Sequence, residues 1–314
     1  KTGAYTVPAD VGTIELDAFT DCTRLTAINV AASDGSYSSD DGVLYDRFKA
    51  TLLQCPGGRT GHYTVPASVL RIDVAAFLNC SSLTSVAIPA SVTRIEPMAF
   101  LGCSSLSSIT VDPSNTVFSS QDGVLFDKTG YRLIQYAGGE TDSSYTVPAS
   151  VSSLGDYSFW GRSSLASVYF KGDQPSGVGD GAFYGADQAT VYYLPGTAGW
   201  GAPFFAGRPA EFLPYLYSVA GDGVSLSAYV GLGGPVTIPS FIEGKPVTAL
   251  EGYAFFNCAS LTSVVIPEGV VSIGRSAFEN CTGMTRAVIP GSVSDIGDSA
   301  FENCTQLTEA VIPK

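Results

Sequence analysis

The chain has 314 residues, of which 45% are hydrophobic, 11% aromatic and only 14% charged. That composition can bury a continuous core, so it excludes the disordered class. The formal net charge of −13 argues against a nucleic-acid partner, because no cluster of Lys or Arg offsets it. Apolar runs such as SVVIP are interrupted every few residues by Ser, Thr, Gly or Pro, so we expect no membrane-spanning segment.

One self-similar line recurs along the chain and reads roughly LTSVxIPxSVxxIGxxAFxNCxS. Its clearest pair is RSAFENCT at 275–282 and DSAFENCT at 298–305. Successive repeat phenylalanines are 58, 23, 59, 24, 72, 23 and 23 residues apart, so each longer gap holds one repeat plus an insertion. Self-similarity with a period of about 20–30 residues predicts a solenoid. At least eight copies are marked by Phe19, Phe77, Phe100, Phe159, Phe183, Phe255, Phe278 and Phe301.

The first two long gaps carry matching insertions, at 34–58 and 112–139. Each contains DGVL followed by an aromatic residue and Asp, then a polar turn and an alternating apolar run, TLLQC or RLIQY. This pattern predicts a β-hairpin carried on the solenoid. Both insertions return to the repeat through YTVPASV, at 63–69 and 145–151.

The third long gap differs, because the repeat pattern is lost from Gly196 to Pro235. Within it, Gly221-Asp222-Gly223 suits a tight hairpin turn. The repeat resumes at VTIPSFIEGKPVTAL, 236–250. We therefore predict an N-terminal block, 1–213, and a C-terminal block, 214–314, that begins with this hairpin. Whether the two blocks form one continuous solenoid stays open at this point.

A single coil can be derived from residues 261–281. The apolar residues of LTSVVIP alternate, which predicts a short strand, and Pro267 ends it because proline cannot donate to the ladder. A single helical turn with Ser276 as its cap is expected over SAFENC. Only neighbouring coils can close the resulting core. The side chains expected to point inward are Leu261, Val264, Ile266, Val270, Ile273, Ala277, Phe278 and Cys281.

Six of the seven cysteines occupy one slot, three residues after the repeat phenylalanine. In the two other copies this slot holds Arg162 and Ala186, which favours a place for a small buried side chain. We favour reduced core thiols over disulfides between neighbouring coils, such as Cys80–Cys103 or Cys258–Cys281, which remain the alternative. With no CxxC pair and one histidine, we expect no metal site. The six are Cys22, Cys80, Cys103, Cys258, Cys281 and Cys304.

The sequence offers little acid–base or nucleophilic chemistry. His62 lies in a glycine-rich stretch and is interpreted as an exposed loop residue, since no GxSxG motif accompanies it. Carboxylates such as Asp40, Asp41 and Glu96 are not placed in pairs across a predictable cleft. The acidic turns at 38–42 and 119–123 are interpreted as solvated turns and not as calcium sites. We predict no catalytic residues and no cofactor, and therefore not an enzyme.

The segments LTSVAIPASVTRIEPMAFLGCSSLSSI at 83–109 and LTSVVIPEGVVSIGRSAFENC at 261–281 resemble BspA-type leucine-rich repeats of bacterial surface proteins. The DGVLFD hairpin, VYYLPGTAGWGAPFFAGRP at 191–209 and VTIPSFIEGKPVTAL resemble elements found between such repeats. The resemblance implies an α/β right-handed solenoid with short parallel strands, short helical turns and inserted hairpins. It also implies a secreted or cell-surface protein that binds matrix proteins or other macromolecules, and it transfers no catalytic residue and no ligand.

The remaining candidates for function lie on the solenoid surface. One outward position per long strand is occupied by Ala87, Thr110, Tyr169, Tyr193, Val265, Val288 and Val311. Stacked valines and tyrosines on adjacent coils would form exposed stripes that bind a partner. The alternative is that an adjacent segment covers them. The binding residues that we predict are Tyr169, Tyr193, Val265, Val288 and Arg286.

These observations predict an extracellular recognition or adhesion protein that binds a protein or glycan through its solenoid face. A passive spacer within a larger surface protein is the second reading, and a polysaccharide hydrolase the third. The chain stops at Pro313-Lys314, directly after a predicted strand. We expect either that the natural chain continues or that this end docks against another molecule, because an open ladder end exposes unpaired backbone groups.

Overall fold

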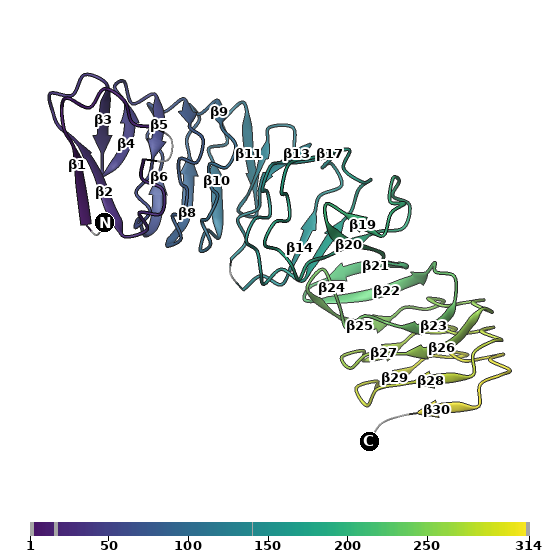
Figure 1. The fold of residues 1–314 in the computed structure, drawn as a ribbon. Coiled ribbons are helices and arrows are strands. Elements are labelled where there is room, and N and C mark those ends of the chain that lie inside the picture. Colours follow the sequence, from purple (N-terminus) through teal and green to yellow (C-terminus); the bar gives the residue numbers. More distant parts are fainter. Residues whose placement is uncertain (1–2, 16–17, 140, 312–314) are drawn as a thin grey trace.

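The computed structural model describes residues 3–15, 18–139 and 141–311, so the predicted chain end at Pro313-Lys314 lies outside the described residues. The chain forms a β-solenoid of stacked coils (Figure 1). The described residues form 30 short strands and no helix. The predicted stacking of short parallel strands is confirmed, and the predicted helical turns are wrong.

The longer strand of each coil belongs to a first parallel ladder, which is interrupted three times. Its four sections pair β1 with β2, then β6, β8 and β10, then β14, β16, β18 and β20, then β23, β26, β28 and β30. The bounds are β1 (Gly3–Val7), β2 (Leu25–Val30), β6 (Gly61–Thr64), β8 (Leu83–Ile88), β10 (Ser108–Val111), β14 (Ser144–Val147), β16 (Ser167–Phe170), β18 (Thr190–Tyr193), β20 (Arg208–Phe212), β23 (Gly234–Thr237), β26 (Leu261–Val265), β28 (Arg286–Val288) and β30 (Glu309–Val311).

Shorter strands form a second parallel ladder at another side of the coil. They correspond to the second apolar pair of the repeat, where for example Ile273 is buried. Their bounds are β7 (Arg71–Ile72), β9 (Arg94–Ile95), β15 (Ser153–Leu154), β17 (Gly177–Val178), β25 (Lys245–Leu250), β27 (Ser272–Ile273) and β29 (Asp295–Ile296).

Both matching insertions form the predicted hairpins and extend this second ladder. In each, two antiparallel strands are followed by a third that pairs antiparallel with the hairpin and parallel with the next coil. The turn at Gly221-Asp222 also joins an antiparallel pair, as predicted. The strands are β3 (Tyr37–Asp40), β4 (Val43–Asp46), β5 (Thr51–Gln54), β11 (Phe118–Gln121), β12 (Val124–Asp127), β13 (Arg132–Gln135), β19 (Phe204–Phe205), β21 (Tyr215–Ala220), β22 (Gly223–Tyr229) and β24 (Phe241–Ile242).

The SAFENC segments form turns because two of their residues adopt a left-handed backbone. In the coil at 275–282 these are Ser276, with φ of 54°, and Asn280, with φ of 62°. A right-handed helix requires negative φ at every position, so the predicted helical turn cannot form here. The freed backbone groups bond the next coil instead, as when the Phe255 N–H donates to the Ala277 carbonyl oxygen at 2.7 Å.

The recurring phenylalanines stack along the interior. Ring centroids of Phe255 and Phe278 are 4.8 Å apart, those of Phe278 and Phe301 are 5.1 Å apart, and both pairs are nearly parallel. Phe77 and Phe100 stack in the same way at 5.2 Å. These rings fill the coil centre where stacked aromatic pairs add stabilisation beyond the buried area.

The direction of stacking changes between β20 and β25, where the C-terminal block leaves the axis of the N-terminal block (Figure 1). The first ladder is not continuous there, because β20 pairs with β18 and β19 while β23 begins a new section. An ion pair between Lys171 and Glu243, at 3.0 Å, joins the blocks, and within the C-terminal block Glu243 also accepts a hydrogen bond from the Tyr217 hydroxyl at 2.6 Å. The division at 213/214 into folding units stays a prediction.

Candidate interaction surface

The outward face of the first ladder is built by one register row, which we call the outward row. It consists of side chains that alternate with the buried positions of each strand. Its members in the three long sections are Thr64, Ala87 and Thr110; Thr146, Tyr169, Tyr192 and Glu211; and Thr237, Val265, Val288 and Val311.

Tyr169 occupies the outward row but is not exposed. Only 5% of its surface is accessible, and its ring stacks on Tyr192 with centroids 5.1 Å apart. It belongs to the same apolar cluster as Leu213 and the interior of the C-terminal block, and burial raises the pKa of its hydroxyl. The expectation of an exposed Tyr169 is therefore wrong, because the second block covers this section of the face.

Tyr193 does not share a row with Tyr169. The structure pairs Tyr169 with Tyr192 and Phe170 with Tyr193. The coil after Phe183 is one residue shorter than the coil after Phe159, so spacing from the phenylalanine assigns the wrong tyrosine. Tyr193 is half-buried and lies flat against Trp200, with centroids 5.1 Å apart and planes at 2°. Tyr192 is the residue that the spacing argument missed, and the shortened interval was the available signal.

In the C-terminal block the outward row stays uncovered. Thr237 is exposed, and Val265 and Val288 are partly exposed on adjacent paired strands. The side chain of Val311 lies outside the described residues. Thr262, Thr285 and Thr308 form an exposed hydroxyl column beside the strands, in which Thr285 Oγ1 donates to the Thr262 carbonyl oxygen at 3.1 Å. The result is a narrow apolar stripe edged by hydroxyls.

Arg286 lies two residues before Val288 on the same strand and is exposed, and its role in binding stays a prediction. Its Nε lies 3.0 Å from Glu309 Oε2, and both side chains are about half accessible. An ion pair this open contributes roughly 0–1 kcal/mol to stability. Arg286 can therefore exchange Glu309 for another acceptor at small cost.

His62 lies in strand β6 and not in a loop, although it is exposed as predicted. Its Nδ1 is 2.8 Å from Ser85 Oγ, and its Nε2 is 2.9 Å from Thr64 Oγ1. Both ring nitrogens are thus occupied by hydroxyls. A serine nucleophile needs a histidine that a third group orients as a base, and here that position holds a threonine.

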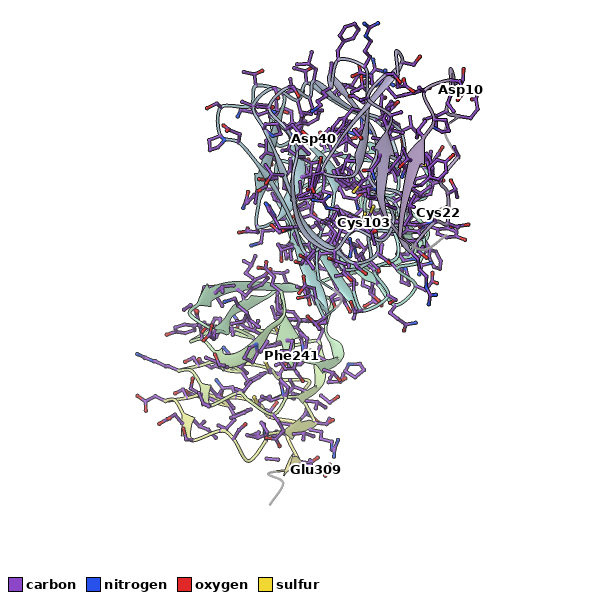
Figure 2. The ribbon with its side chains drawn as sticks, turned by 90° about the vertical axis from the view of Figure 1, so that its left-hand side faces the viewer. Asp10, Cys22, Asp40, Cys103, Phe241 and Glu309 are labelled. Carbon is purple, nitrogen blue, oxygen red and sulfur yellow. The ribbon has the colours of Figure 1, made fainter. Side chains whose placement is uncertain are left out.

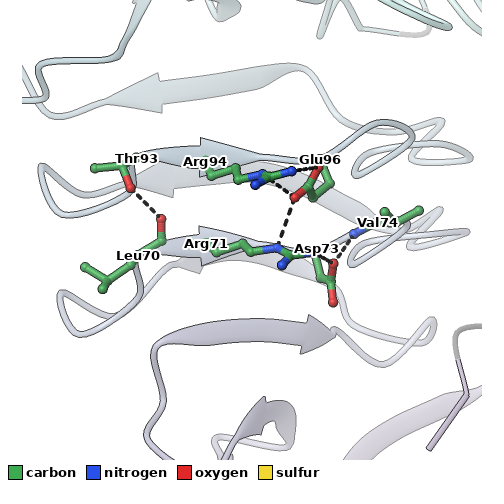
Figure 3. Close-up of polar contacts among 7 residues, drawn as sticks. All are labelled: Leu70, Arg71, Asp73, Val74, Thr93, Arg94 and Glu96. Carbon is green, nitrogen blue, oxygen red and sulfur yellow. Dashed lines mark hydrogen bonds and ion pairs between the residues drawn. The ribbon is translucent and has the colours of Figure 1, made fainter.

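Four charged residues on the second ladder neutralise one another (Figure 3). Glu96 Oε1 lies 2.5 Å from Arg94 Nε and 3.1 Å from Arg71 Nε. Arg71 Nη2 also reaches Asp73 Oδ1 at 2.6 Å. Glu96 is one of the carboxylates that sequence analysis considered for acid–base catalysis. Both of its guanidinium partners are part of the same ion-pair cluster, so the Glu96 carboxylate is engaged in structural contacts.

The cysteine slot faces the carbonyl group of the preceding coil. Cys103 Sγ donates to the Phe77 carbonyl oxygen, and Cys281 Sγ to that of Phe255, each at 3.1 Å. All seven cysteines are free thiols in the structure. Burial raises the pKa of the Cys281 thiol to about 12, so the thiolate that reacts is suppressed.

Arg162 shows that the slot is not reserved for small side chains. It is 6% exposed, and its guanidinium donates to the carbonyl oxygens of Ser104 and Gly138 at 3.0 and 2.9 Å. Longer bonds reach the carbonyl oxygens of Cys103 and Tyr136. Each slot therefore holds either a hydrogen-bond donor that faces carbonyl oxygens or a small side chain.

The described residues show neither a metal-binding cluster nor a membrane-spanning helix. No group of three or more His, Cys, Asp or Glu side chains within that part of the chain is arranged to hold a metal ion. Over the same residues, no helix has the length and apolar character needed to cross a membrane.

Stacked short strands, a recurring phenylalanine and inserted hairpins define a bacterial type of leucine-rich solenoid. Six repeat copies over residues 59–127, 140–202 and 236–314 match the BspA type leucine rich repeat region. These stretches make up more than half of the chain, which therefore belongs to this family. No curated protein matches the chain.

Several solved bacterial structures are similar. A leucine rich repeat protein of T. pallidum is 35% identical over 32% of this chain and 48% of its own, with a TM-score of 0.31, so this chain spans about half of that relative. A leucine-rich repeat protein of Eubacterium ventriosum is 17% identical over 99% of this chain and 78% of its own, at 0.42. A leucine rich cell surface protein of Faecalibacterium prausnitzii is 22% identical over 99% and 79%, at 0.39.

Proposed function

We propose that the chain is an extracellular, surface-attached or secreted, recognition protein without catalytic activity. It would bind a protein or glycan partner through the outward row of its C-terminal block. Membership of the BspA type family supports the bacterial surface location, as does the description of the F. prausnitzii neighbour. The two acid–base candidates, Glu96 and His62, are each held by other side chains, which supports the absence of catalysis.

The observation that carries this proposal is the contrast among sections of the outward row. In the N-terminal block the row is short and polar (Thr64, Ala87, Thr110) or covered at the junction. In the C-terminal block Val265 and Val288 stay accessible, with Arg286 beside them. An apolar strip with a polar rim and one loosely held arginine has the composition of a contact site, since arginine is enriched at interfaces.

The test replaces the stripe without disturbing the strands. In a double variant, Val265→Thr with Val288→Thr, the β-branched shape is kept and the apolar surface removed, which makes this section resemble Thr64 and Thr110. The purified chain would be probed on arrays of matrix proteins and glycans. We expect the double variant to lose most of the captured signal and the matched control, Thr64→Val with Thr110→Val, to retain it.

Equal capture by wild type and the double variant would remove the stripe from the site. If no array component binds either chain, the spacer reading gains, since a stalk requires no partner. Digestion assays on surface polysaccharides address the hydrolase reading. We expect no product, because Glu96 is held by two arginines and His62 by two hydroxyls.

A further inference from the structure

A pocket of about 330 Å³ opens where the two blocks meet. One wall comes from the N-terminal block, with Ser143, Ser144 and the stacked pair Tyr169 and Tyr192. The opposite wall comes from the C-terminal block, with Pro239 and Phe241. Figure 2 shows Phe241 in the C-terminal block, near the place where the blocks meet. Ligand sites form preferentially at such junctions, and this volume lies at the small end of their usual range.

The chemistry of the lining is amphipathic and uncharged. Phe241 is 59% exposed and Tyr192 partly exposed, so both present aromatic surface to the opening. Ser143 is exposed and Ser144 partly exposed, so their hydroxyls are accessible to a ligand in the opening. None of the ten lining residues is charged. A ligand that fits must offer apolar faces to the rings and hydrogen-bonding groups to the serines.

The charged side chains near the pocket are one ion pair and the exposed carboxylate of Glu211, which lies beside Tyr192. Lys171 pairs with Glu243, which also accepts from the Tyr217 hydroxyl. No arginine or lysine is therefore available in the wall to receive an acidic group, and the net charge of −13 disfavours anionic ligands further. This excludes acidic sugars and phosphorylated ligands as the best fit.

We propose that the junction pocket binds one uncharged sugar ring of a glycan. A pyranose has C–H faces that pack on aromatic rings and a rim of hydroxyl groups that pair with serine hydroxyls, which matches the lining. An apolar peptide side chain would use the rings but leave the serine hydroxyls unpaired, at a cost. This inference rests on the proposed recognition function and gives it a substrate class and a second site, separate from the Val265 stripe.

The test fills the pocket. Ala166 lies on its rim, is exposed and precedes β16, so Ala166→Trp places an indole in the opening without removing a core group. Ala259→Trp adds the same side chain at an exposed site of the C-terminal block and serves as the control. Saturation-transfer NMR would measure binding of methyl glycosides of glucose, galactose, mannose and N-acetylglucosamine, with methyl glucuronide as the acidic comparator.

We expect at least one neutral glycoside to bind the wild-type chain. The same glycoside should bind the Ala166→Trp variant at least about tenfold more weakly. Ala259→Trp should bind as wild type does, and methyl glucuronide should not bind. If Ala166→Trp lowers the melting temperature, Phe241→Ala decides, because an exposed ring can be removed with little effect on the core. It should weaken binding severalfold.

The proposal is overturned if no neutral glycoside binds the wild-type chain or if binding survives both pocket variants. These results are separable from failure of the proposed function. The Val265→Thr, Val288→Thr variant should keep glycoside binding while losing partner capture, and Ala166→Trp should lose glycoside binding even if the stripe captures nothing.

Discussion

The regular coils of the C-terminal block fill the slot with cysteine, whereas one coil of the N-terminal block fills it with arginine, and the difference shows what the slot requires. In the C-terminal block, Cys281 and Cys304 each donate a thiol hydrogen to one carbonyl oxygen of the preceding coil. In the N-terminal block the coil after the second insertion uses Arg162, whose guanidinium reaches four carbonyl oxygens. The slot at the second insertion therefore faces several carbonyl oxygens, whereas the slots of Cys281 and Cys304 each face one.

Position 162 follows an insertion that interrupts the first ladder between β10 and β14. The chain enters and leaves the insertion beside this slot. Carbonyl groups of residues 103–104 and 136–138 therefore lie close together there and pair with no neighbouring strand of the described residues. Buried carbonyl groups cost free energy when unpaired, and a planar guanidinium with five donors can serve several at once. Arg162 therefore joins the coils on either side of the insertion.

The strongest test of this comparison is Arg162→Ala. We expect a loss of about 3–5 kcal/mol in the free energy of unfolding, because the change leaves a cavity and removes the donor to the Ser104 and Gly138 carbonyl groups. Urea unfolding followed by circular dichroism would measure it. Arg162→Lys is the control, since it keeps the charge but not the fork, and should recover only part of the loss. A cost below about 1 kcal/mol for Arg162→Ala would contradict the bridging role.

Tyr169 and Tyr193, which sequence analysis assigned to the same outward position, differ in their burial. Tyr169 is buried in the cluster that joins the blocks, while Tyr193 is half-buried against Trp200. Tyr169→Ala should cost about 2–4 kcal/mol, as for other buried aromatic rings, and Tyr193→Ala about 1 kcal/mol. Differential scanning calorimetry of the two variants would measure the difference. Equal melting temperatures would mean that Tyr169 does not hold the junction.

The repeat pattern predicted most of the fold, and the predictions that were wrong have physical causes. Strands, hairpins and the phenylalanine stack follow from alternation, turn residues and spacing, which are local signals. The turns were missed because left-handed residues such as Ser276 and Asn280 are not evident from apolar spacing. Tyr169 was misplaced because its covering comes from a block distant in sequence. Tyr193 was misplaced by a single missing residue, which shifts a strand by one side chain.

A third prediction concerns the position two residues after each repeat phenylalanine. Its backbone φ is positive in every coil, and its occupants are Asp21, Asn79, Gly102, Gly161, Gly185, Asn257, Asn280 and Asn303. Asn280 also donates its amide to Asn257 Oδ1 and accepts from Asn303 Nδ2, both at 2.9 Å. Asn280→Ala should cost about 1–2 kcal/mol, since alanine is strained there and the amide ladder is cut.

Asn280→Gly separates the two contributions to that loss. Glycine adopts positive φ without strain but cannot continue the amide ladder. We expect it to be more stable than Asn280→Ala by about 1 kcal/mol in the same urea measurement. If both variants lose equally, the ladder and not the backbone conformation explains the conserved chemistry of the position within this chain.

The smallest expected effect is at a single cysteine. Cys281→Ala removes one thiol hydrogen bond and one sulfur atom from the interior, so we expect a loss of about 1 kcal/mol in the free energy of unfolding. Ala186, which is fully buried in the equivalent slot, shows that a coil tolerates the substitution.

Wild-type Cys281 should also resist alkylation at pH 8 in the folded chain, because burial raises its pKa to about 12 and little thiolate forms. The partly buried Cys22, Cys258 and Cys304 should react before the buried thiols. Mass spectrometry after labelling the unfolded, unreduced chain should find seven reactive thiols; five or fewer would mean that a disulfide staples the coils and that the cost of Cys281→Ala must be interpreted through that bond.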